Sequence, residues 1–157
     1  MSEWQRGVRL GIDVGKARVG VARCDPDGLL AVPVETVPRS DQTVARIAEV
    51  AEEWDAREIL VGLPVNLRGE DTPSTVDARD MAREIAERTG RIVRLVDERL
   101  STVSAHAALR ASGRTQKNSR SMVDQVAAVV LLQQAIDTEK STGTPAGAAI
   151  QPPEESA

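Results

Sequence analysis

The sequence predicts an α/β fold with one mixed sheet and helices on its faces, on three observations. Residues 8–14 and 18–23 alternate apolar with small or polar residues, at the period of two typical of strands. Turn-forming residues separate them from a third strand over residues 29–37, which predicts an antiparallel meander. Helical and strand patterns then alternate to the end of the domain. A meander followed by such alternation is typical of a mixed sheet.

The helix after the meander is expected to begin at Ser40 or Asp41, either of which can bond the first free amides. Apolar residues then recur at helical spacing, and Trp54 is expected to anchor that face in the core. A short apolar run over residues 58–64 follows. Such a run after a helix is typical of a buried parallel strand.

A second helix is expected from about residue 74 to residue 88. It begins either with a capping box from Ser74 to Asp77 or with Thr72 before Pro73, and Gly90 stops it. Further along the chain, the patterns predict a strand over residues 91–96, a helix from Ser101 or Thr102 to Ala111, and a final helix from Ser119 or Ser121.

Composition divides the chain of 157 residues into one domain with two tails. We expect a flexible N-terminus over residues 1–7, one domain over residues 8–138 and a disordered tail over residues 139–157. Small, polar and proline residues dominate this last segment, which cannot bury enough apolar area to offset its ordering entropy.

Composition also narrows the range of functions. Phe and Tyr are absent, so stacking of single-stranded bases on aromatic rings is almost excluded. The single cysteine, Cys24, permits no internal disulfide or cysteine metal cluster and is expected to be a small apolar strand residue. No apolar run is long enough for a membrane span and no signal-peptide pattern is present, so we expect a cytoplasmic protein without a membrane partner.

Three acidic residues occupy positions where a site is expected. Asp13 lies within the first strand, Glu98 follows the last strand and Asp124 lies early in the last helix. Sites of open sheets gather at the carboxyl ends of parallel strands. Converging carboxylates repel unless a cation such as Mg²⁺ or Mn²⁺ neutralises them, and two such ions can support phosphodiester hydrolysis. The alternatives are a turn-bonding Asp13, a surface Glu98 and an Asp124 favoured by the helix dipole.

A basic segment separates the last two acids. Residues 99–123 contain five Lys or Arg and no Asp or Glu, in a protein of net charge −4. Such a segment is expected of a phosphate-binding surface, and the alternative is a solvated helical face. The basic residues are Arg99, Arg110, Arg114, Lys117 and Arg120. The lone histidine, His106, is expected on a helix surface, and Lys16 in the first turn adds to the basic surface.

Four ordered motifs carry a family resemblance that spans roughly residues 8–136. They are Gly11-Ile12-Asp13-Val14-Gly15, Val61-Gly62-Leu63-Pro64-Val65-Asn66, Asp97-Glu98-Arg99-Leu100-Ser101-Thr102, and Val123-Asp124-Gln125-Val126-Ala127-Ala128. Together they resemble the YqgF/RuvX family of Holliday-junction-resolvase-like proteins.

The resemblance implies an RNase H-like fold and a divalent-metal-dependent endonuclease acting on structured nucleic acid. It implies Asp13, Glu98 and Asp124 as the catalytic, metal-binding triad. Two roles are attached to the family, namely processing of the 5′ end of pre-16S ribosomal RNA and resolution of Holliday junctions in branched DNA. A junction has two-fold symmetry, so resolving one would suggest a homodimer.

Basic and amide side chains near these acids are expected to bind the substrate. They are Lys16, Asn66, Arg99, Lys117 and Arg120, and Arg68 follows Asn66 in the same loop. The family often places basic residues two and four positions before the last Asp. Here Met122 occupies the nearer position, so the phosphate contact is expected from Arg120 or Lys117.

Two other functions fit parts of the pattern. A non-catalytic module for nucleic acid or ribosome assembly would need the basic segment but not the acids. A nucleotide-binding phosphotransferase would use Asp13 and Gly15 as the first phosphate loop of the actin and sugar-kinase superfamily. Those enzymes need two such subdomains, and this chain has the length of one.

Overall fold

The computed structural model describes residues 4–66, 68–97 and 116–150, with only the backbone described for residues 116–124. Its strands are β1 (Arg9–Val14), β2 (Arg18–Cys24), β3 (Ala31–Pro38), β4 (Glu58–Leu63), β5 (Ile92–Asp97) and β6 (Ala148–Ile150). Its helices are α1 (Thr43–Glu53), α2 (Pro73–Thr89) and α4 (Gln116–Thr142).

The strands form one mixed sheet in the order β3-β2-β1-β4-β5-β6. The first three strands pair antiparallel, β1, β4 and β5 pair parallel, and β6 pairs antiparallel with β5. This arrangement confirms the predicted meander and the predicted parallel strands. Pro33 lies on β3 at the sheet edge, where the register with β2 shifts by one residue, as expected for a residue that cannot complete a ladder.

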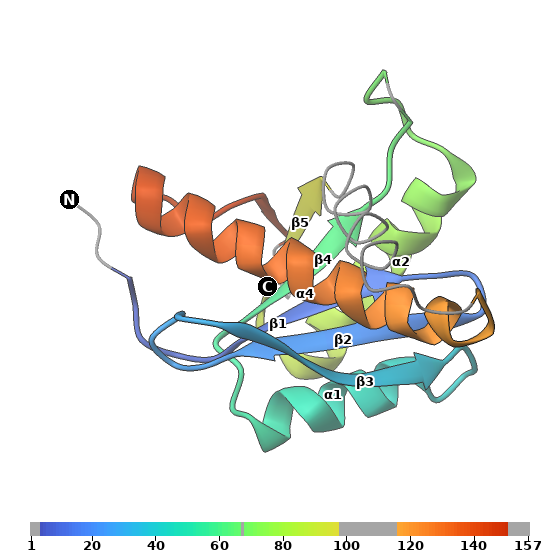
Figure 1. Cartoon of the computed structure of the whole chain (residues 1–157), viewed down its shortest axis with the longest axis horizontal. Helices are drawn as coiled ribbons and strands as arrows, with labels where there is room; N and C mark the ends of the chain where they lie inside the picture. Colours follow the sequence, from blue (N-terminus) through green and yellow to red (C-terminus); the bar gives the residue numbers. More distant parts are fainter. Residues whose placement is uncertain (1–3, 67, 98–115, 151–157) are drawn as a thin grey trace, which may run out of the picture.

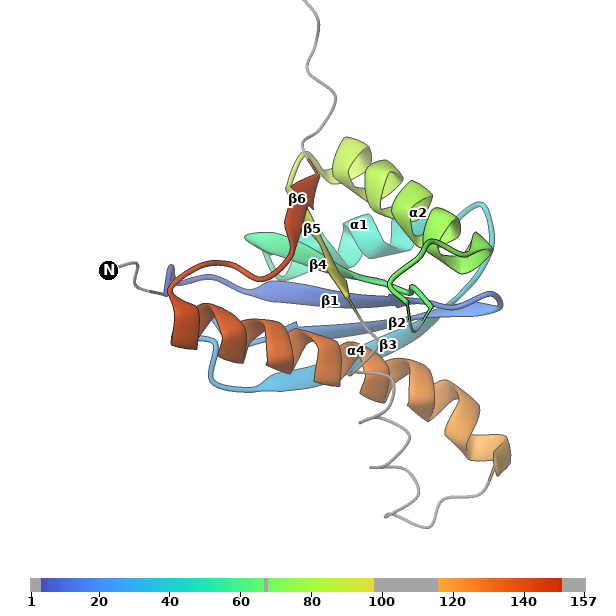
Figure 2. The same cartoon turned by 90° about the horizontal axis from the view of Figure 1, so that it is seen from above.

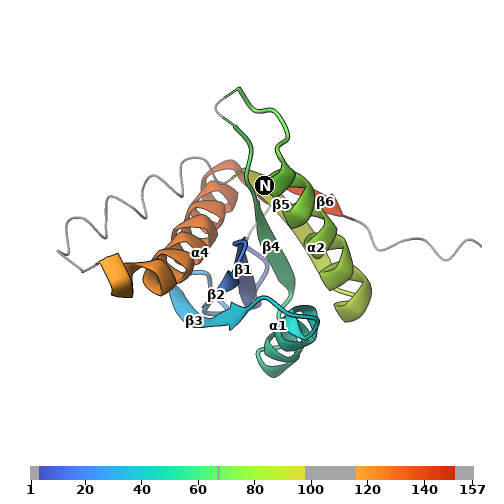
Figure 3. The same ribbon diagram turned by 90° about the vertical axis from the view of Figure 1, so that its right-hand side faces the viewer.

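Helices cover both faces of the sheet (Figures 1 and 2). Figure 3 shows α4 on one face and α1 with α2 on the other. The core is accordingly divided in two. Ile12, Val61 and Ile85 belong to the cluster on the α1 and α2 side, while Leu60 and Leu132 belong to the cluster under α4.

Gly11 allows α4 to lie close to the sheet. A Cβ atom at this position would stand 2.8 Å from the carbonyl oxygen of Ala128 and 2.8 Å from Cβ of Leu132. Any side chain would therefore force the helix away from β1. This close approach fixes where α4 crosses the strands. It therefore also fixes the height of each helix residue, meaning its position along the direction of β1.

The structure corrects three local predictions. Trp54 ends α1 with 36% of its surface exposed, and the guanidinium of Arg23 stacks on its ring at 4.0 Å from the centroid, so it is not a core anchor. The N-cap of α1 is Gln42, rather than Ser40 or Asp41. Thr72 caps α2 in a reciprocal box with Thr75, so the alternative from Ser74 to Asp77 is wrong.

Other local predictions are confirmed. Gly90 ends α2 in the left-handed conformation, at a φ of 65°. Cys24 is fully buried in β2. The predicted helix over residues 101–111 and His106 lie outside the described residues.

The tail is partly ordered. Residues 139–142 continue α4 and residues 148–150 form β6 on the edge of the sheet, so the expectation of disorder is wrong for these segments. Residues 151–157 lie outside the description, and the domain limits at 8 and 138 stay a prediction. Among the described helices, none is long and apolar enough to cross a bilayer.

Candidate active site

Asp13 faces α4 near the carboxyl end of β1. Side chains alternate along a strand, and Gly11, two residues earlier, contacts α4 directly. Asp13 therefore lies on the α4 face of the sheet, one position past the buried Ile12. It is half-buried.

Two glycines flank Asp13 in the sheet. Gly20 is its antiparallel partner on β2. On the other side, Ile12 is opposite Val61, so the next position along both parallel strands places Asp13 beside Gly62. Neither neighbour has a side chain, so these two strand positions place no side chain beside Asp13. Glycine also allows another group to approach the backbone closely.

α4 runs antiparallel to β1 and brings Asp124 to the level of Asp13. Arg9 approaches Glu139, whereas Gly11 lies against Ala128, so helix numbers fall as strand numbers rise. Two residues along a strand and four along a helix both advance about 6–7 Å. One such step beyond the contact between Gly11 and Ala128 places Asp13 and Asp124 at the same height.

A hydrogen bond between α4 and β3 supports this placement. The side-chain amide of Gln125 donates to Oγ1 of Thr36 at 2.8 Å. Thr36 is opposite Gly20, which in turn is opposite Asp13. The residue directly after Asp124 on α4 is therefore bonded to the strand row that contains Asp13.

The turn that follows Asp13 is fixed by an arginine. The amide of Gly15 donates to the carbonyl oxygen of Arg18 at 2.9 Å and closes the turn, which leaves Lys16 exposed at its tip. Arg39 donates to the carbonyl oxygen of Gly15 at 2.8 Å and forms a bidentate pair with Asp77 at 2.8 and 2.9 Å. The hydrogen bonds from Arg39 hold the pKa of Asp77 below its ordinary value.

The loop between β4 and α2 projects from the carboxyl end of the sheet (Figure 1). Asn66 organises it, because its side-chain oxygen Oδ1 accepts from the backbone amides of Arg68 and Glu70, both at 2.9 Å. Its amide nitrogen also donates to the carboxylate of Glu70 at 3.2 Å. Asn66 is exposed, and its side chain shapes the loop that presents Arg68. The predicted role of Asn66 as a substrate ligand stays a prediction.

The remaining predicted site residues fall partly or wholly outside the description. Glu98 and Arg99 lie outside the described residues, directly after the end of β5. Lys117, Arg120 and Asp124 lie on α4, with only their backbone positions described. Among the side chains that the structure describes, no group of three potential metal ligands is found, and those of Glu98 and Asp124 do not belong to that set.

Comparison with known proteins identifies the family. The sequence profile described as RuvX, Holliday junction resolvase, matches residues 7–138. The chain belongs to the RuvX family. A relative from Clavibacter sepedonicus is 56% identical over 147 residues, which cover 92% of this chain and 91% of the relative. One from Streptomyces coelicolor is 47% identical over 150 residues, covering 94% and 90%. Both relatives carry the provisional name of pre-16S rRNA nuclease.

Solved structures agree on the fold of this RuvX-family chain. Thermus thermophilus RuvC in complex with a Holliday junction substrate matches with a TM-score of 0.58 and 20% identity, over 90% of this chain and 99% of RuvC. A second solved structure of Thermus thermophilus RuvC matches with a TM-score of 0.56. The predicted RNase H-like fold and the predicted family are confirmed. The names of the family and of its members describe nucleases and resolvases that act on nucleic acid.

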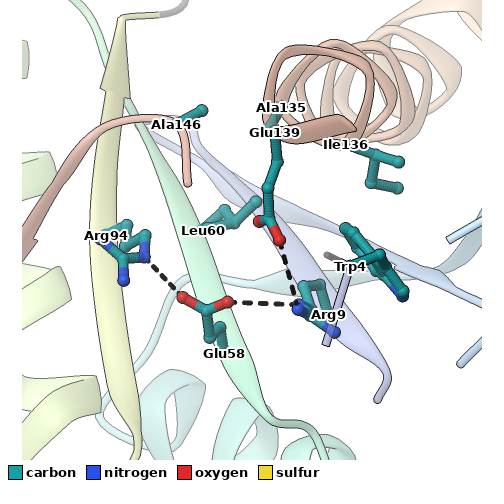
Figure 4. Close-up of a pocket in the computed structure, with 9 residues that line it drawn as sticks. All are labelled: Trp4, Arg9, Glu58, Leu60, Arg94, Ala135, Ile136, Glu139 and Ala146. Carbon is teal, nitrogen blue, oxygen red and sulfur yellow. Dashed lines mark hydrogen bonds and ion pairs between the residues drawn. The ribbon is translucent and has the colours of Figure 1, made fainter. Parts of the chain in front are cut away.

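Sequence reasoning missed a second charged group, at the opposite end of the same sheet face. Arg9, Glu58 and Arg94 come from β1, β4 and β5, and Glu139 comes from the last turns of α4 (Figure 4). Arg9 is 2% exposed and Glu58 is 5% exposed. A charged residue at the start of each of two apolar strands was the available signal, because such residues are rarely buried without a partner.

Proposed function

We propose that this protein is a divalent-metal-dependent endonuclease that hydrolyses phosphodiester bonds of structured nucleic acid in the cytoplasm. Its substrate is either the 5′ region of pre-16S ribosomal RNA or a branched DNA junction. The observation that carries the proposal is the common height of Asp13 and Asp124 on β1 and α4, with glycines beside Asp13. Membership of a family named for resolvase and nuclease activity supports the substrate class.

The donor set fits a hard divalent cation. Asp13 and Asp124, with Glu98 directly after β5, which is separated from β1 by β4, offer carboxylate oxygens, which Mg²⁺ and Mn²⁺ prefer. When bound, one or two such ions would activate a water and stabilise the leaving oxygen of the phosphodiester. The role of the three carboxylates is to hold the ions on the rigid face between β1 and α4.

The basic and amide residues have a separate role, which is to position the substrate backbone. Lys16 lies at the tip of the turn after Asp13, and Arg68 lies on the loop organised by Asn66. Both belong to loops at the carboxyl end of the sheet. Arg99, Lys117 and Arg120 belong to the basic segment between the last two acids, and we assign them to phosphate contacts.

The test is a cleavage assay on two substrates in parallel, a labelled four-way DNA junction and a precursor 16S RNA fragment. Each is incubated with Mg²⁺, with Mn²⁺ or with chelator, using the wild type and Asp13→Asn. We expect metal-dependent cleavage of one substrate by the wild type and none by the variant. Circular dichroism and thermal unfolding of Asp13→Asn must match the wild type, because loss of folding would mean that Asp13 is structural.

The same assay identifies the polymer and addresses the non-catalytic alternative. Cleavage of the RNA alone would assign the protein to ribosomal RNA processing, and cleavage of the junction alone would assign it to resolution. Binding of either substrate without metal and without turnover would contradict the proposal. That result would favour a module that retains the fold and binds nucleic acid only.

A further inference from the structure

The charged group beneath the end of α4 borders a cavity that the proposed nuclease reaction does not use. The cavity has a volume of about 250 Å³ and opens at the amino ends of β1, β4 and β5. This volume is far larger than a single structural water needs. Its walls include Trp4, Arg57, Ile92, Arg94, Glu139 and Pro145.

The two carboxylates at this cavity do not use all of its arginine donors. Glu58 accepts from Nε of Arg9 at 3.2 Å and from Nε of Arg94 at 2.5 Å, so both of its oxygens are engaged (Figure 4). Nη1 of Arg9 donates to the carbonyl oxygens of Gln5 and Gly7, and its Nη2 lies 3.7 Å from Glu139. All three nitrogens of the Arg9 guanidinium therefore contact protein oxygens.

Arg94 and Arg57 have donors to spare. Within the described residues, the two Nη groups of Arg94 and the whole guanidinium of Arg57 make no hydrogen bond to protein. No fully buried side-chain nitrogen or oxygen in that part of the chain lacks a partner, so these donors reach the cavity or solvent. Three arginines face two glutamates here, which leaves an excess of positive charge in a protein of net charge −4.

The cavity also has apolar walls beside these donors. The indole of Trp4 is held by Arg9, whose guanidinium lies 3.9 Å from the ring centroid, and by its own Nε1–H bond to the carbonyl oxygen of Pro26 at 2.9 Å. Ile92 and Pro145 add apolar surface. A ligand with an oxyanion at one end and a sugar or base at the other would match this arrangement.

We propose that this cavity binds a phosphate monoester of the size of a nucleoside monophosphate, with Arg57 and Arg94 donating to the phosphate. Guanidinium groups pair with phosphate oxygens in a fork geometry, and both Arg57, directly before β4, and Arg94, on β5, line this cavity. Trp4, Ile92 and Pro145 face the rest of the ligand. The site lies at the other end of the sheet from Asp13, so it does not depend on the proposed nuclease activity.

The test follows Trp4 fluorescence in the Trp54→Phe background, which leaves Trp4 as the only tryptophan. The probes are inorganic phosphate and adenosine 5′-monophosphate, titrated without divalent metal at constant ionic strength. We expect a saturable change in Trp4 fluorescence with both probes. Tighter binding of the nucleotide than of inorganic phosphate would support the proposal, because the apolar walls then contribute to affinity. Equal affinities would assign recognition to the phosphate alone and would contradict the proposed ligand size.

Two variants make the proposal falsifiable. Arg57→Gln removes an exposed guanidinium without an ion pair in the described structure, so its fold should be intact, and we expect affinity to fall at least tenfold. Arg94→Gln should do the same, and Arg83→Gln on the outer side of α2 should leave affinity unchanged. No saturable change with either probe, or an affinity that Arg57→Gln does not alter, would overturn the proposal.

Discussion

The sheet face beneath α4 carries charged residues at both ends, and the two ends treat them differently. At the amino end, Arg9, Glu58 and Arg94 stand on three neighbouring strands, and Glu58 forms ion pairs with both arginines inside the protein. At the carboxyl end, Asp13 lies beside glycines on both neighbouring strands, and α4 brings the position of a second aspartate to the same height. Opposite charges in contact stabilise the fold, whereas carboxylates brought together repel each other unless an external cation neutralises them.

Burial explains why the charged residues at the amino end must be paired. A charge removed from water costs several kcal/mol unless a partner and hydrogen bonds compensate it. Arg9 meets that requirement with Glu58, two backbone carbonyls and the ring of Trp4. Burial also raises the pKa of Glu139, which closes the same group from α4. We therefore expect substitutions at the two ends to separate stability from activity.

The largest effect on stability is expected from Glu58→Gln. This change leaves the buried Arg9 with only its longer contact to Glu139, at 3.7 Å, and removing one partner of a buried pair costs about 3–5 kcal/mol. Urea denaturation measures the loss, with the exposed Glu87→Gln as the matched control. Cleavage by the folded fraction at low temperature should persist, because the change lies at the amino end. A stable variant without activity would contradict the division between the two ends.

A smaller loss of stability, shared by both ends, is expected from Gly11→Ala. The added methyl would meet the carbonyl oxygen of Ala128 and Cβ of Leu132 at 2.8 Å, so α4 must shift. Overpacking of this kind costs about 1–3 kcal/mol. Moving α4 also moves Asp124 relative to Asp13, so cleavage should fall roughly tenfold or more. Thermal unfolding and single-turnover cleavage would measure the two effects, and unchanged cleavage in a destabilised variant would contradict the predicted height of Asp124.

Arg39→Gln should affect activity more than stability. Its pair with Asp77 is partly exposed, so its loss should cost only about 0.5–1 kcal/mol. The same side chain holds the carbonyl of Gly15 next to the turn that carries Lys16, and a displaced turn should lower cleavage roughly tenfold. Arg83→Gln, which loses a surface pair elsewhere on α2, is the control. Recovery of cleavage in Arg39→Lys would confirm that the side chain at position 39 holds this turn. An equal loss of cleavage in Arg83→Gln would refute it.

The smallest effect is a dependence of stability on acid pH. Hydrogen bonds from the amides of Leu30, Leu29 and Asp27 hold the pKa of Asp25 below its ordinary 3.8. A carboxyl group with a lower pKa in the folded chain stabilises the fold above the unfolded pKa. That contribution disappears as the pH falls through the folded pKa. Asp25→Asn should therefore flatten the fall in the free energy of unfolding below about pH 4. An unchanged acid slope would show that the amides do not stabilise the carboxylate.

The sequence drew attention to residues at the carboxyl end and not to the charged group at the amino end, and strand pairing explains why. Asp13 stands out within one strand, because an acid between apolar residues is visible without any partner. Arg9 and Glu58 are 49 positions apart and meet only because β1 pairs in parallel with β4 in one register. A local pattern does not contain that register. Trp54 illustrates the same limit, since the residue whose guanidinium stacks on its ring, Arg23, belongs to β2, far from Trp54 in the sequence.

The tail shows a different limit of composition. Ala148, Ala149 and Ile150 offer little apolar area, yet they pair with the edge of β5. Backbone hydrogen bonds supply most of this pairing, and of the three side chains only Ile150 packs against the core. Gly147 permits the approach, because a Cβ atom there would lie 2.3 Å from the carbonyl oxygen of Leu95. An estimate based on side chains alone therefore predicted disorder where an exposed edge was available.

The most direct test is binding of Mn²⁺ by the wild type, by Asp13→Asn and by Glu139→Gln, measured by electron paramagnetic resonance without nucleic acid. The two variants each remove one carboxylate from the α4 face, one at each end. We predict that the wild type and Glu139→Gln bind the ion with similar affinity and that Asp13→Asn does not. Undiminished binding by a folded Asp13→Asn, or loss of binding in Glu139→Gln, would contradict a metal site at the carboxyl end.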